Sequence, residues 1–364
     1  MLAMSNASGC SSPFPSHLDQ PILDAKLASA ATLGSLAAIS ELLAQGANPL
    51  FGESRALSLA AKGGHAECVK LLIPVSDPTA DDNSTALCWA AMKGHVECVR
   101  LLISVSNPKS NNSAALVAAA HRGHLECVKL LIPVSEPNAS SSSALCQAAL
   151  DGHADCVALL IPVSDPKANQ SAALSLAARA GHAECVKLLI PVSNPKASES
   201  EALGWASYSG SAECVSLLIP VSDPLAGGSR ALIFAVGNGH ARCVELLAPV
   251  SDINLDDSQA LSIAAVNGHV ECFKHLLSSS PPLLHMRELL SDVIAAGNAR
   301  ILAIMLAHEP LLLKRIDLAN TLSAATRNGH AEMAMLISSI VEKKALAASS
   351  KGRSAPNSSG SRRL

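Results

Sequence analysis

The sequence predicts an all-α solenoid of stacked helix-turn-helix units. A Gly-His pair recurs at residues 64–65, 94–95, 123–124, 152–153, 181–182, 239–240, 268–269 and 329–330. At Gly210 and Gly297 the glycine keeps its phase, and every step from Gly94 to Gly297 is 29 residues. A fixed period of about 20 to 50 residues is typical of repeats that bury their apolar faces against neighbouring copies.

The composition fits one elongated repeat domain. Of 364 residues, 49% are apolar but only 2% are aromatic, so Ala, Leu, Val and Cys must fill the core between closely packed helices. Because each unit contacts only its neighbours, we expect a curved rod of about 100 Å, at about 9–10 Å per helix pair. A net charge of -3 gives no general attraction to nucleic acid. The sequence has neither an apolar run of membrane-spanning length nor a typical secretory signal.

Eleven cysteines are present, and most of them follow the repeat. One phase is held by Cys68, Cys98, Cys127, Cys156, Cys185, Cys214, Cys243 and Cys272. Equivalent positions on stacked helices lie roughly 8–10 Å apart, whereas a disulfide needs Cα atoms within about 7 Å. We therefore expect reduced, buried thiols that act as small hydrophobic groups, which fits a cytoplasmic setting.

The first element along the chain is a Ser-rich segment, residues 1–20, without a charged side chain before Asp19. We expect it to be disordered. Two interpretations are open: an untied terminus, or a secretion leader, because the Ser-rich and uncharged composition resembles the leaders of bacterial type III effectors.

The second element, residues 21–345, contains the helix pairs. In the unit around Gly181, the glycine ends the first helix in a left-handed conformation. Glu184 at the start of the second helix faces Lys187, and such a pair contributes about 0.2–0.5 kcal/mol on a solvated face. We expect a buried stripe of Cys185, Val186, Leu188 and Leu189. In the unit before, Pro162 ends the second helix and Asp165-Pro166 predicts a tight turn.

These units resemble ankyrin repeats. The resemblance lies in Gly46-Ala47-Asn48-Pro49 after Ser40-Glu41-Leu42-Leu43, and in the repeated pattern of Ala56–Leu72. It covers roughly Ile22 to Lys343, about eleven repeats. It implies that the turn histidine bonds the backbone of the adjacent unit, and that partners bind the concave helix-one face.

The chain departs from the ankyrin pattern in two ways. Ser-Arg-Ala-Leu or Ser-Ala-Ala-Leu stands where ankyrin repeats have Thr-Pro, and the period is 29 rather than 33 residues. The missing residues fall where ankyrin repeats carry a β-hairpin finger. We therefore expect short inter-repeat loops in place of fingers.

The chain ends in two atypical stretches. Residues 280–345 begin with Pro281-Pro282 and lengthen the glycine step to 32, which predicts degenerate capping repeats. Residues 346–364 form a basic tail without an acidic residue, which we expect to be disordered. The tail is either solubilising or a nucleic-acid or nuclear-targeting segment.

His-x-x-Cys occurs seven times, for example at His65 and Cys68. A Cys-His nucleophile pair is disfavoured because an enzyme needs one activated cysteine rather than seven equivalent ones. A zinc array is disfavoured because each unit offers at most two of the four ligands that zinc prefers. We predict no catalytic residue, no metal ligand and no cofactor.

The positions just before each turn glycine vary while their framework stays constant. The ankyrin resemblance places them at the end of helix one on the concave face. We predict a partner-binding stripe there: Met92, Lys93, His121, Arg122, Leu150, Asp151, Arg179, Tyr208, Asn238 and Asn267. The alternative is drift at unconstrained surface positions.

Two further sets of residues leave alternatives open. Lys109, Lys167 and Lys196 form a loop edge that either steers an acidic partner or is ordinary surface. Trp89 and Trp205 stand where other copies have Leu59, Leu176, Phe234 or Ile263, and are either core residues or binding anchors.

These observations predict a non-catalytic, monomeric protein–protein interaction scaffold. Its partner is a protein of unknown identity, and neither nucleic acid nor a membrane is expected. The expected location is the cytoplasm, or a host cell if residues 1–20 are a secretion leader. Two alternatives are an adaptor that regulates an enzyme or degradation complex through its tails, and a thiol or metal array.

Overall fold

The computed structural model describes residues 20–80, 84–253, 255–279 and 286–352. These residues form 22 α-helices with short 3-10 segments, and none of them lies in a strand. The α-helices alternate as the first and second members of eleven pairs. This confirms the predicted all-α repeat fold and its number of repeats. The chain divides into two compact units, residues 1–198 and 199–364.

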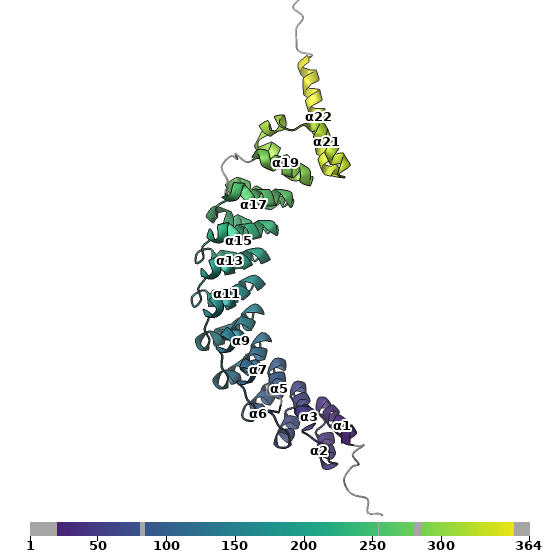
Figure 1. Cartoon of the computed structure of the whole chain (residues 1–364), viewed down its shortest axis with the longest axis vertical. Helices are drawn as coiled ribbons and strands as arrows, with labels where there is room; N and C mark the ends of the chain where they lie inside the picture. The colour runs from purple at the N-terminus through teal and green to yellow at the C-terminus, as the bar shows by residue number, and fades with distance from the viewer. Residues whose placement is uncertain (1–19, 81–83, 254, 280–285, 353–364) are drawn as a thin grey trace, which may run out of the picture. The chain divides into compact units, whose positions relative to one another are not determined.

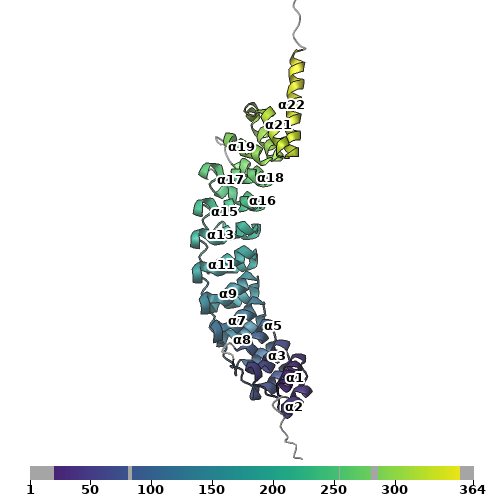
Figure 2. The same ribbon diagram turned by 45° about the vertical axis from the view of Figure 1, so that its right-hand side comes forward.

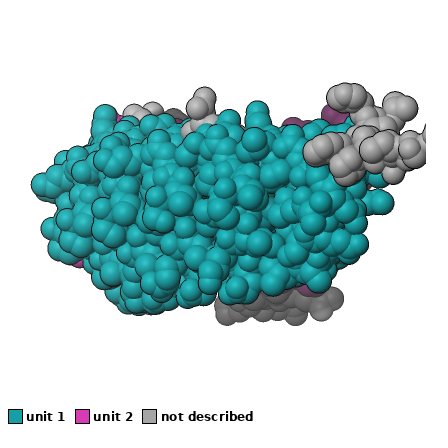
Figure 3. All heavy atoms as spheres, turned by 90° about the horizontal axis from the view of Figure 1, so that it is seen from below, with its two compact units in different colours: residues 1–198 teal, residues 199–364 magenta. Residues whose placement is uncertain are grey.

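Unit 1, drawn in teal in Figure 3, consists of two layers of helices (Figure 1). The first-helix layer contains α1 (Gln20–Leu33), α3 (Phe51–Gly63), α5 (Thr85–Lys93), α7 (Ser110–His121), α9 (Ala139–Leu150) and α11 (Ala168–Ala180). The second-helix layer contains α2 (Leu36–Ala44), α4 (Ala66–Leu72), α6 (Val96–Leu102), α8 (Leu125–Leu131), α10 (Ala154–Leu160) and α12 (Ala183–Leu189). Each helix packs on the next member of its own layer.

Unit 2 repeats the two-layer arrangement, with α15 beside α16 and α17 beside α18 (Figure 2). Its first helices are α13 (Ala197–Ser209, which begins at the unit boundary), α15 (Ala226–Gly237), α17 (Leu255–Val266), α19 (Met286–Ala296) and α21 (Leu318–Arg327). Its second helices are α14 (Ala212–Leu218), α16 (Ala241–Leu247), α18 (Val270–Ser279), α20 (Ala299–His308) and α22 (Ala331–Gly352).

The core is built from the same kinds of side chain in successive repeats. Seven residues before each turn glycine from Gly34 to Gly297 a leucine is buried, as at Leu116, Leu145 and Leu232. Cys185, Val186 and Leu189 of α12 are buried as predicted. Leu188 is only half-buried, so its assignment to the buried stripe is wrong. It lies next to Lys187, at the margin of the buried face.

Proline ends several second helices in a 3-10 turn, as predicted for Pro162. Because proline has no backbone N–H, it cannot continue the α-helical hydrogen bonds. The 3-10 segments that carry it are η1 (Ile73–Val75), η2 (Ile132–Val134), η3 (Ile161–Val163), η4 (Ala248–Val250) and η5 (Pro310–Lys314). The last of these lies within the lengthened step between Gly297 and Gly329.

The Gly-His turn locks successive repeats together. Gly64 and Gly94 adopt φ of 76° and 74°, a left-handed conformation that favours glycine. A Cβ at Gly64 would also lie 2.5 Å from the His95 ring. Nε2 of His95 lies 3.0 Å from the Lys62 carbonyl oxygen, and Nε2 of His124 lies 3.1 Å from that of Met92. The structural role expected for the histidine is confirmed.

A left-handed turn interrupts several first helices just after their first residue. Asn111, Asn112 and Ser113 have φ of 45°, 57° and 61°, and the buried Ser113 hydroxyl accepts a hydrogen bond of 2.8 Å from the Glu136 N–H. Left-handed conformations cost least for Gly and for short polar residues such as Asn. Equivalent Ser hydroxyls that accept from the backbone 23 residues further on are Ser54, Ser84, Ser142, Ser171, Ser200 and Ser229.

The ends of the chain differ in part from the expectations. Residues 1–19 and 353–364 lie outside the described residues, as do the prolines at 281 and 282. Helix α22 continues to Gly352, beyond the boundary predicted at 345. Helix-favouring Lys, Ala and Leu residues continue through this stretch. The predicted tail therefore begins with helix.

Candidate functional site

The predicted stripe lies at the C-terminal ends of the first helices, seven of its residues in unit 1 and three in unit 2. Lys93, Arg122, Arg179, Tyr208, Asn238 and Asn267 are exposed, whereas Met92, His121, Leu150 and Asp151 are half-buried. Within unit 1 the structure brings together Met92 and His121 in one groove, and places His121 against Asp151. The stripe residues therefore do not form a single uniform surface.

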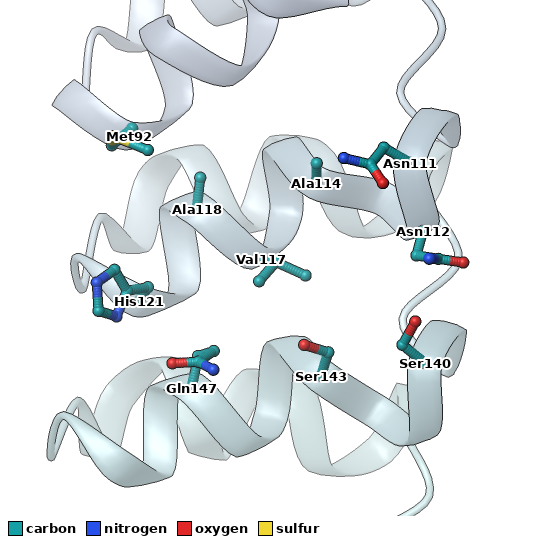
Figure 4. Close-up of a pocket in the computed structure, with 10 residues that line it drawn as sticks. All are labelled: Met92, Asn111, Asn112, Ala114, Val117, Ala118, His121, Ser140, Ser143 and Gln147. Atoms are coloured by element: carbon teal, nitrogen blue, oxygen red, sulfur yellow. The ribbon is translucent and has the colours of Figure 1, made fainter. Parts of the chain in front are cut away.

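A groove opens on the first-helix layer at α5, α7 and α9 (Figure 4). Its volume is about 420 Å³. Figure 4 shows Val117 and His121 of α7 on the side that faces Ser143 and Gln147 of α9, with Met92 contributed by α5. The remaining lining residues are Asn111, Asn112, Ala114, Ala118 and Ser140.

Small side chains produce this groove. Five residues before the turn glycine, other repeats of unit 1 have Leu59, Trp89 and Leu176, but α7 has Ala118 and α9 has Gln147. Nine residues before it, Arg55 of α3 corresponds to Ala114 and Ser143. Ala118 and Gln147 were missed because, at this phase, the two tryptophans were compared only with copies that have a large apolar residue there. When the repeats are aligned at the positions five and nine residues before the turn glycine, the smaller side chains of α7 and α9 stand out.

The groove has unused hydrogen-bonding groups along its edges. Nδ1 of His121 lies 2.5 Å from Oδ2 of Asp151. The carboxylate of Asp151, the acidic residue of the stripe, is therefore already in contact with His121. Among the described residues, the side chains of Asn111, Asn112 and Gln147 have no hydrogen-bond partner. Because an amide both donates and accepts, these three groups can bond a polar ligand in either sense.

The turn end of the groove carries positive charge. Lys93 follows Met92 and Arg122 follows His121; both are exposed and form no ion pair with any described residue. In the preceding repeat, the Lys62 ammonium lies 4.2 Å from the centre of the Trp89 ring. At the other end of α7, Lys109 pairs with Glu136 at 3.3 Å, so the predicted basic loop edge is partly neutralised.

Unit 2 has an aromatic cluster at the corresponding helix positions. The ring centres of Trp205 and Tyr208 lie 5.7 Å apart, and those of Tyr208 and Phe234 lie 5.8 Å apart, both edge to face. The Arg230 guanidinium lies 5.8 Å from the Phe234 ring. Tyr208 is 48% exposed, while Trp205 is half-buried like Trp89 in unit 1. Each tryptophan is thus packed against the protein on part of its surface and exposed to solvent on the rest.

The second-helix face carries ion pairs within single helices. Lys129 contacts Glu126 at 2.7 Å, Lys187 contacts Glu184 at 2.7 Å, and the sign-reversed pair of Arg242 and Glu245 is 2.6 Å apart. This confirms the predicted facing of the two positions. Exposed pairs of this kind contribute little stability, and they leave few uncompensated charges for a partner.

The cysteines are poor candidates for chemistry. The ten cysteines that the structure describes are free. Burial raises the pKa of Cys127 to about 11, with a smaller contribution from the adjacent Glu126 carboxylate. Burial likewise raises the pKa of Cys243 to about 11. Since the thiolate is the reactive species, these thiols are inert near neutral pH.

In the described ranges, no cluster of three or more His, Cys, Asp or Glu residues has metal-binding geometry. No helix among those same residues has the length and apolar character needed to cross a bilayer.

The two-layer helix pairs and their variable exposed face define a helical-repeat interaction scaffold. The family model for ankyrin repeats (3 copies) matches residues 27–113, 105–170, 145–226 and 203–283. The chain belongs to the ankyrin repeat family. Its repeats are those of a protein–protein interaction module, and such modules are typically non-catalytic.

One solved structure similar to this chain is the human ASB11 ankyrin repeat domain. The two share 24% sequence identity, and the match covers 48% of this chain and 95% of that domain, with a TM-score of 0.39. No curated protein matches the sequence.

Proposed function

We propose that the first-helix face of unit 1 binds a protein partner, without catalysis by this chain. The observation that carries this proposal is the contrast between the two faces. On the second helices, cations such as Lys129 and Lys187 are paired within their own helix. On the first helices, Lys93 and Arg122 have no such partner among the described residues and flank a groove. An open groove and unpaired cations thus occur together on the first-helix face.

The proposed setting is the cytoplasm, either of the cell that makes the protein or of a host cell. The host-cell setting draws only on the Ser-rich composition of residues 1–20. A translocation reporter fused to these residues tests that part separately, since it does not depend on the repeat domain. A reporter that stays in the producing cell excludes the effector setting.

The binding proposal is tested by affinity capture with the full chain and two matched triple variants. The first-helix variant is Met92→Ala, Lys93→Ala and Arg122→Ala. The second-helix control is Lys70→Ala, Arg100→Ala and Lys129→Ala, which changes the same repeats on the other face. We expect a partner that the parent and the control capture and the first-helix variant loses.

Two other outcomes contradict the proposal. Equal capture by both variants places the binding surface elsewhere and favours an adaptor that works through its tails. Loss with the second-helix variant alone assigns binding to that face. Circular dichroism confirms that each variant retains the helical fold of the parent.

A further inference from the structure

We propose that the groove at α5, α7 and α9 binds an extended peptide segment of the partner, with a large apolar side chain flanked by acidic residues. This inference rests on the proposed function and specifies the chemistry of the partner.

The shape fits a short segment of chain. From Ala114 to His121, helix α7 rises about 10 Å at roughly 1.5 Å per residue. About three residues of extended peptide span that length at roughly 3.3 Å each. The volume of about 420 Å³ lies within the usual range of ligand sites. Ala118 leaves room for a side chain of the ligand where Leu59 or Trp89 would fill it.

The lining residues fit a peptide whose apolar side chain enters the groove and whose backbone is hydrogen-bonded at the groove edges. Met92, Val117 and Ala118 supply an apolar wall, and the flexible methionine adapts its shape to the side chain that it contacts. A peptide that loses water here must satisfy its backbone N–H and C=O groups. The side-chain amides of Asn111, Asn112 and Gln147 offer both donors and acceptors for them.

The charge at the turn end of the groove selects an acidic flank. Lys93 and Arg122 lie at the turn end beside Met92 and His121, and neither is paired with a described carboxylate. Asp151, the acidic residue of the same end, is held by His121 at 2.5 Å. A partner carboxylate would find cations, whereas a basic segment would be repelled by like charge.

The test uses fluorescein-labelled nine-residue peptides with a central Leu-Phe pair. One has glutamate flanks, one has lysine flanks, one has glutamine flanks, and a fourth keeps the glutamates but replaces Leu-Phe with Ser-Ser. Fluorescence anisotropy measures their affinity for the full chain. The parent should bind the Glu-flanked Leu-Phe peptide about tenfold or more tightly than the other three, a difference of about 1.4 kcal/mol.

Two variants probe the groove, with one control. Ala118→Leu fills it with a residue that Leu59 and Leu176 already place at the same phase, so folding is preserved. We expect it to weaken binding about tenfold or more. Lys93→Glu with Arg122→Glu should reverse the preference toward the Lys-flanked peptide. Lys70→Glu with Lys129→Glu changes the net charge equally on the second-helix face and should leave affinity within about twofold.

Three results would overturn the proposal: equal affinity for all flanks, unchanged binding by Ala118→Leu, or no binding of any peptide. If a partner is still captured through the first-helix face in any of these cases, the scaffold function stands and the groove assignment alone fails. If the first-helix variant also captures the partner as well as the parent does, the proposed function fails together with the groove assignment.

Discussion

The groove of unit 1 and the aromatic cluster of unit 2 are built at the same phases of the repeat with opposite content. Five residues before the turn glycine, the groove has Ala118 and Gln147, whereas the cluster has Trp205 and Phe234. Beneath both surfaces, the leucine seven residues before the turn is fully buried. The comparison shows that the repeat keeps a constant core residue seven positions before the turn glycine. The surface residue five positions before that glycine is free to be small or large.

The largest effect tests the constant part of the comparison. Leu145→Ala beneath the groove and Leu232→Ala beneath the cluster each remove a buried side chain of the same phase. Each should lower the free energy of unfolding by about 2–5 kcal/mol, because a cavity replaces packed atoms. Urea unfolding followed by circular dichroism measures both, and Leu225→Ala, at a side chain 56% exposed, is the control. A large effect of only one substitution would show that the two cores differ.

An intermediate effect tests the filled surface. Trp205→Ala removes an edge-to-face contact with Tyr208 and part of the apolar burial, and should cost about 1–3 kcal/mol. Trp205→Phe keeps an aromatic ring at this position and should lose less. The same unfolding measurement applies, and a change below about 0.3 kcal/mol for Trp205→Ala would mean that the cluster adds no stability.

The smallest effect tests the hollow surface. Ala118→Leu should change the free energy of unfolding by less than about 1 kcal/mol, because the site has space and the repeat accepts leucine there. Ala119→Leu is the matched control, since Ala119 is fully buried and the added atoms must displace packed neighbours. If Ala118→Leu destabilises as strongly as Ala119→Leu, the groove is not open space.

The repeat could be predicted from the sequence because its strongest constraints fix the residue type at a recurring position. A left-handed turn demands glycine at Gly64 or Gly94, and the ring of the next histidine excludes any Cβ there. The hydrogen bond to the Ser113 hydroxyl was not predicted, because serine occurs in many environments. Only the folded structure shows that this hydroxyl accepts from a backbone N–H 23 residues further along the chain.

The candidate site was predicted less completely. Variable positions beside the turn were correctly placed at the ends of the first helices, but their grouping depends on neighbours in other repeats. His121 faces Asp151 across 30 residues of sequence, and the groove depends on Ala114 and Ala118, which look like ordinary helix residues. A hollow is a property of what adjacent helices leave unfilled, so no single repeat reveals it.

The interlocked Gly-His turns bear on how such a chain changes length in evolution. The ring of His124 lies over Gly94, and the ring of His153 lies in the same way over Gly123. Removal of one whole 29-residue repeat would bring an identical ring to an identical glycine. The longer steps of 30 residues after Gly64 and 32 residues after Gly297 keep the same contact with His95 and His330, so the connecting loop absorbs small changes of length. Duplication or deletion of whole repeats can therefore move the groove and the aromatic cluster apart or together along the sequence without loss of this contact.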